Sequence, residues 1–148
     1  MVHTDSLNSV AKEIQSLLEA DQVTLGLADV FYGDQSRIPR TPAACIEPGD
    51  KKREYVGAPR RTEVGFTVYV IVYHYSLQSI QETQNENDLL AESIETLIHS
   101  NVTLNGLVID SLVSNIELGY QAKGNTMFRA SKITIEAKSR VQLPMATF

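Results

Sequence analysis

Cysteine and histidine are the residue types in this chain that could form a nucleophilic centre. Among its 148 residues the chain has one cysteine, Cys45, and three histidines, His3, His74 and His99. Cysteine catalysis needs a thiolate beside an imidazole that takes its proton. Cys45 stands in an apolar run, residues 43–46, where a small buried thiol is the simpler interpretation. We therefore expect no catalytic residues, and we expect that the protein is not an enzyme.

Metal and phosphate chemistry are also poorly supported by the spacing of residues. The sequence contains no CxxC or HxxxH pair and no acidic calcium loop, which are the usual arrangements of ligands. Its eight glycines are dispersed, and neither GxxxxGK[ST] nor GxGxxG occurs. We expect no metal and no cofactor, and a single cysteine allows no intramolecular disulfide.

Positive charge is concentrated in residues 37–63, RIPRTPAACIEPGDKKREYVGAPRRTE. This segment holds seven of the 13 lysines and arginines and four acidic residues, so it carries +3 while the remainder carries −8 of the net −5. Its prolines and glycines favour turns, and we predict a long basic loop over about residues 33–62. A charged projection of this kind is typical of a contact surface. The proposed contact residues are Arg37, Arg40, Lys51, Lys52, Arg53, Arg60 and Arg61.

An acidic stretch offers a complementary surface. Residues 82–95 contain no lysine or arginine, so they lack the i, i+4 ion pairs that usually support an exposed helix. Glu82, Glu86 and Glu92 are candidates for contact with the basic loop of a neighbouring copy. Two alternatives stay open at this point: a solvated loop without a partner, and a nucleic-acid contact. The second is disfavoured by the negative net charge and by a single aromatic residue in the loop, Tyr55.

Hydrophobic periodicity predicts the elements that position these residues. Leu7, Val10 and Ile14 repeat at helical spacing, while the run VGFTVYVIVYHY has apolar residues on both faces and predicts a central strand. The predicted order is α-β-β-β-α-β-β, an α+β fold with a mainly antiparallel sheet of about five strands and two helices packed on one face. We predict helices over residues 5–20 and from a capping box at residues 79–82 onward, and strands over residues 23–32, 43–47, 63–75, 107–119 and 126–141.

Composition is that of a folded protein, with 43% apolar and 21% charged residues. The length favours a single domain, residues 1–148. No apolar run approaches the roughly 20 residues that cross a bilayer, and no basic segment followed by an apolar stretch marks a secretion signal at the start. We therefore expect a protein that is made in the cytoplasm and makes no membrane contact.

The element order resembles that of the tail terminator and tail-completion (neck) proteins of long-tailed bacteriophages. The likeness covers most of the chain. It includes the segments RTPAACIEPG, residues 40–49, and GAPRRTE, residues 57–63, which are similar to the corresponding part of such proteins.

The resemblance implies a structural virion protein that acts without a cofactor. Such a protein forms a ring, as a hexamer, at the head-proximal end of the tail, where it caps the tail tube and ends its polymerisation. Its expected partners are further copies of itself, the tail tube protein and the connector or neck proteins of the head, after assembly in the host cytoplasm. Related head–tail joining adaptors share this size and fold class, and they remain an alternative.

Overall fold

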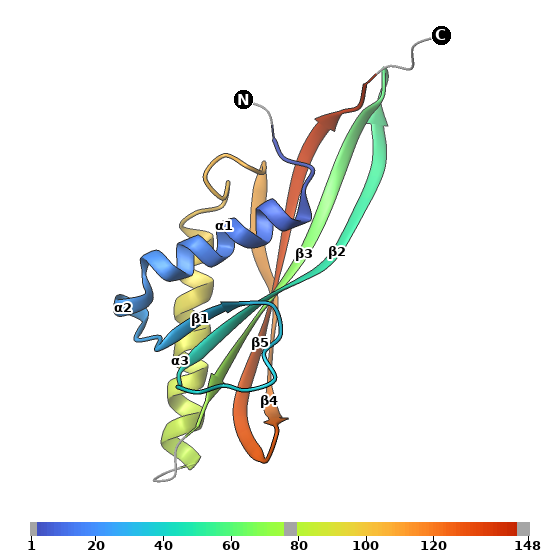
Figure 1. Cartoon of the computed structure of the whole chain (residues 1–148). Helices are drawn as coiled ribbons and strands as arrows, with labels where there is room; N and C mark the ends of the chain where they lie inside the picture. Colours follow the sequence, from blue (N-terminus) through green and yellow to red (C-terminus); the bar gives the residue numbers. More distant parts are fainter. Residues whose placement is uncertain (1–2, 76–79, 145–148) are drawn as a thin grey trace.

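A five-stranded sheet carries the two long helices on one of its faces (Figure 1). The computed structural model describes residues 3–75 and 80–144. The strand order is β1-β2-β3-β5-β4, with β1 parallel to β2 and every other pair antiparallel. This arrangement confirms the predicted α+β class. The elements are α1 (Leu7–Ala20), α2 (Gln22–Leu25), β1 (Asp29–Tyr32), β2 (Ala43–Gly57), β3 (Arg61–His74), α3 (Ile80–His99), β4 (Asp110–Lys123) and β5 (Thr126–Gln142).

The predicted first helix is confirmed as α1. Ser6 is its N-cap and accepts a hydrogen bond from the Ser9 N–H at 3.2 Å, which satisfies one of the free donors of the first turn. Val10, Ile14 and Leu18 are fully buried because their spacing places them on one stripe of the helix. That stripe packs against the sheet and orients the helix layer.

β3 is the central strand, as predicted. It pairs with β2 on one side and with β5 on the other along its whole length. Its helix-side residues, including Phe66 and Val70, belong to the main core. On the opposite face Ile71 and Tyr73 join a smaller cluster that includes Ile38 from the loop before β2. The second face of the strand therefore meets an apolar layer at one end of the sheet.

The predicted strand over residues 23–32 is wrong in its first part. Residues Gln22–Leu25 form the short helix α2, which ends at Gly26 in the left-handed region with φ of 76°. Only residues Asp29–Tyr32 form a strand. Alternation of apolar and small residues over six positions does not distinguish a strand from one helical turn. A glycine in the left-handed conformation at the C-cap position is typical of a helix end.

The predicted long basic loop is not present. Residues 33–42 do form a loop, but β2 continues to Gly57 and turns through residues 58–60 directly into β3. The register between β2 and β3 runs from Ala43 opposite Tyr73 to Gly57 opposite Arg61. We call residues 48–67 of this hairpin the arm. In Figure 1 the arm projects away from the helices, with the end of β5 beside it.

Residues Pro48, Gly49 and Asp50 do not end β2 because the strand absorbs them in a bulge. The pairing register shifts between Pro48 and Lys51, beyond the point where β1 stops pairing with β2. A proline is tolerated on a strand that lies at the sheet edge. A Cβ on Gly49 would lie 2.7 Å from the Thr67 carbonyl oxygen, so the close approach of the two backbones requires glycine.

α3 confirms the second predicted helix, and the first residue of its predicted capping box, Ser79, lies outside the described residues. The helix is held to the sheet by a buried polar cluster around Asn87. The Asn87 side-chain amide donates to the Val72 carbonyl at 3.1 Å and lies 2.9 Å from His74 Nδ1, while Ser131 Oγ donates to its oxygen. No helix within residues 3–75 and 80–144 has the length and apolar character needed to cross a membrane.

The last two strands form the predicted hairpin, although β4 begins and ends later than predicted. β4 forms one outer edge of the sheet. On the opposite side, β1 covers only residues 43–46 of β2, so no described strand pairs with the outer side of the arm. Both edges of the sheet therefore present unpaired backbone groups along much of their length.

Candidate functional site

The residues considered for nucleophilic chemistry are not brought together. Cys45 is buried in the small cluster on the face away from the helices, whereas His74 lies on the helix side against Asn87. Burial raises the pKa of the Cys45 thiol to about 12, which keeps it protonated at neutral pH. The third partner, His99, accepts a hydrogen bond from the Val113 N–H through Nε2 at 3.0 Å and so links α3 to β4.

The predicted basic surface divides into two separate parts. Arg37 and Arg40 lie in the loop before β2. Arg40 donates to both carboxylate oxygens of Asp29, at 3.1 and 2.5 Å, and so closes this loop onto β1. Arg37 is exposed. These two residues are therefore positioned by the body of the protein and not by the arm.

The remaining basic candidates lie on the arm. Within the described part of the chain, no acidic group lies in ion-pair distance of Lys51, Lys52, Arg60 or Arg61. Arg53 differs because it contacts Asp5 at 3.0 Å and donates to Thr62 Oγ1 at 2.9 Å. This contact links the base of the arm to the segment preceding α1.

The tip of the arm is tied to β5. The Leu143 N–H donates to the Arg60 carbonyl at 3.0 Å, and the Gln142 side-chain amide donates to the Pro59 carbonyl at 2.6 Å. Arg60 itself has a φ of 54° in the turn. The turn is thus supported by a third strand, and the basic residues on it are presented by an ordered hairpin.

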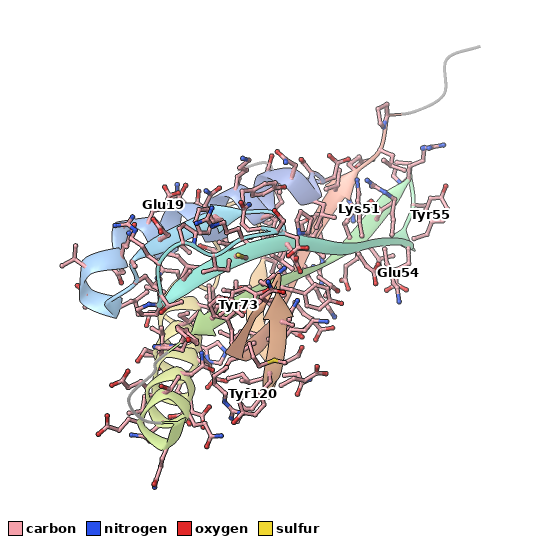
Figure 2. All side chains as sticks on the ribbon, turned by 60° about the horizontal axis from the view of Figure 1, so that its bottom comes forward. Glu19, Lys51, Glu54, Tyr55, Tyr73 and Tyr120 are labelled. Atoms are coloured by element: carbon pink, nitrogen blue, oxygen red, sulfur yellow. The ribbon has the colours of Figure 1, made fainter. Side chains whose placement is uncertain are left out.

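Two exposed apolar residues accompany these charges. Tyr55 is 70% exposed and Val56 48% exposed, and Figure 2 shows Tyr55 near the far end of the arm, beyond the helices. Tyr55 faces the same side of the sheet as Arg53, but no helix extends far enough to cover it. The sequence indicates Tyr55 only as the single aromatic residue of the basic segment, and its lack of cover depends on where α1 begins.

The acidic candidates lie on α3. Glu82, Glu86 and Glu92 are exposed, and neither Glu86 nor Glu92 forms an ion pair with a described residue. Nearby Asp88 is different, because Arg129 contacts it at 3.3 Å. Glu86 and Glu92 therefore leave negative charge uncompensated on the outer side of the helix.

A groove between α2 and α3 adjoins this acidic surface. Its volume is about 860 Å³, and its walls include Leu25, Leu89 and Leu97 together with the carboxylates of Asp21 and Glu86. No lysine or arginine lines it. Sequence reasoning did not find this groove because α2 was predicted as a strand.

The arm and the helices α2 and α3, whose residues line the groove, lie at opposite ends of the molecule (Figure 1). The two surfaces carry opposite charge, yet they cannot meet within one chain. No family model matches the sequence, and a comparison with curated proteins found no match either.

Proposed function

We propose that this protein is a structural subunit of a bacteriophage tail, which assembles into a hexameric ring at the head-proximal end, caps the tail tube and provides the surface for head attachment. One observation carries the proposal: a basic arm and a helix, α3, whose Glu86 and Glu92 form no ion pair with a described residue lie at opposite ends of one chain. Head-to-tail rings require two different complementary surfaces on each subunit. The element order adds support through its likeness to tail terminator proteins.

The experiment is a measurement of solution mass by light scattering over a range of concentrations, with electron microscopy of the main species. We expect a closed ring of a few subunits, or binding to the ends of purified tail tubes that prevents their further growth. A protein that stays monomeric and leaves tube growth unchanged would contradict the proposal. Binding to isolated connectors without any effect on tube growth would instead favour a head–tail joining adaptor.

Charge reversal tests whether the arm makes the contact. The double substitution Arg60→Glu and Arg61→Glu should leave the fold intact, because both side chains are exposed, and should abolish ring formation. The matched comparison is Arg61→Glu alone against Lys12→Glu, which changes the net charge equally at an exposed position that is not among the proposed contact residues. Loss of assembly in both variants would show that net charge matters and would remove the specific role of the arm.

A nucleic-acid contact remains the second candidate because the arm is a projecting two-stranded ribbon with unpaired basic residues. A β-ribbon fits the major groove of DNA. This alternative predicts binding that weakens steeply with added salt. A band-shift assay at low salt decides, since no shift excludes it.

A further inference from the structure

We infer that the α2–α3 groove is the docking site for the arm tip of a second copy of this chain, with Tyr55 and Val56 as apolar anchors. The inference deepens the proposed function and rests on it, because it names the two surfaces through which neighbouring subunits associate. The proposed occupant, the arm tip, carries both apolar and basic groups.

The groove has the features of an unfilled recognition site. Leu25, Leu89 and Leu97 line it, and Leu89 on its α3 wall is 54% exposed. Exposed apolar residues gathered beside a concave surface indicate an interaction site more often than scattered ones do. The lining residues of the groove include the acidic Asp21 and Glu86 and, among the described residues, no lysine or arginine, so the groove favours an apolar ligand that also carries positive charge.

The arm tip provides such a ligand. Tyr55 and Val56 are exposed and stand close in sequence to Arg53, Arg60 and Arg61. Tyrosine and arginine are the residues most enriched among those that dominate binding energy at interfaces. The tip is held by backbone contacts with β5, so docking costs little conformational entropy.

Charge completes the match between the two surfaces. Arg60 and Arg61 have no ion-pair partner within the described residues, and Asp21 and Glu86 likewise form none. Bringing these groups together at the rim steers the arm toward the groove and sets its orientation. Because the arm lies at the opposite end of the molecule from α2 and α3 (Figure 1), the resulting contact is head-to-tail and repeats from one subunit to the next.

The test uses two variants and their mixture. Tyr55→Asp disables the arm and leaves the groove intact, whereas Leu89→Asp disables the groove and leaves the arm intact. Each variant alone should be monomeric by analytical ultracentrifugation. An equimolar mixture retains one functional arm and one functional groove, so it should form a heterodimer and no larger species. Met127→Asp is the matched control, an exposed apolar position outside both surfaces, and it should assemble like the wild type.

The Tyr55→Ala variant measures how much the tyrosine ring contributes to the affinity between subunits. Truncation of a central interface residue costs about 2 kcal/mol or more, which corresponds to a loss of roughly 30-fold in affinity. Circular dichroism of each variant checks the fold, and the exposed positions of both residues make unfolding unexpected.

The outcomes separate this inference from the proposed function. If the Tyr55→Asp and Leu89→Asp variants both form rings as the wild type does, the groove is not the docking site, while the proposed ring function stands. Monomeric variants whose equimolar mixture also stays monomeric would overturn the inference, because the intact arm of one variant should bind the intact groove of the other. A wild type that is monomeric at every concentration would overturn the second copy as occupant, and a tube-capping assay would then decide the proposed function independently.

Discussion

Replacing Asn87 should destabilise the protein more than any exposed substitution on α3. Asn87 is fully buried and contacts three polar partners: the Val72 carbonyl, His74 Nδ1 and the Ser131 hydroxyl. In Asn87→Ala these partners lose their hydrogen bonds while they stay buried. Each buried polar group left without a partner costs about 1–3 kcal/mol.

Water entering the space left by the amide would recover part of this cost. We therefore expect a loss of about 3 kcal/mol in the free energy of unfolding, which lowers the melting temperature of a chain this size by roughly 6–12 °C. Urea-induced unfolding, followed by circular dichroism, measures this loss. The slope of the free energy of unfolding against urea concentration should stay unchanged.

Asn85→Ala is the matched control, because Asn85 is an exposed asparagine on the same helix and should change the stability by at most about 0.5 kcal/mol. A loss below about 1 kcal/mol in Asn87→Ala would refute the reasoning. It would mean that the polar cluster does not hold α3 to the sheet.

Three further predictions concern the strands. Burial lowers the pKa of His74, with nearby Glu86 opposing the shift, so the folded state favours the neutral ring. The free energy of unfolding should therefore fall as the pH drops below about 6.5, the ordinary pKa of histidine. Unfolding of His74→Asn measured across this pH range should lack this decrease. Gly49→Ala should destabilise the folded protein by about 1–3 kcal/mol because its Cβ would overlap the β3 backbone. Gly65→Ala is the control and should not destabilise it, because open space surrounds the Cβ there. Equal melting temperatures of the two variants would contradict this prediction. Cys45, with its pKa raised to about 12, should react with a thiol reagent only after denaturation, and rapid labelling of the native protein at pH 8 would show that it is accessible.

Long apolar elements could be predicted from the sequence because burial leaves a periodic pattern. β3 was predicted almost to its ends because nearly every residue from Val64 to Tyr73 is apolar and the strand is covered on both faces near its C-terminal end. α1 was predicted for the same reason, with four fully buried residues on its inner side. In both elements the tertiary environment and the local preference agree.

The arm could not be predicted in the same way. Residues 50–57 of β2 are exposed on both faces, so they carry no alternation of apolar and polar residues. Their strand conformation follows from pairing with β3 and from the bulge at Pro48 to Lys51, which are contacts distant in sequence. Proline followed by glycine is also the usual pattern of a turn, and this local pattern was misleading here.

The candidate surfaces were predicted in part. The charges themselves could be counted, and the exposed positions of Lys51, Arg61 and Glu86 follow the expectation. Their positions relative to one another depend on the hairpin and on α2, both of which were predicted differently. The role of Asn87 left no trace in the sequence, because a buried asparagine within a polar stretch looks like any other.

The open backbone edge of the arm has a consequence for the behaviour of the isolated chain. An uncovered strand can recruit further strands and start aggregation. Pro48, the bulge after it and the charges of Lys51 and Lys52 are the devices that natural proteins place on such edges as gatekeepers. The lysines on the arm thus oppose edge-to-edge pairing of the chain, and this protection does not depend on the proposed assembly.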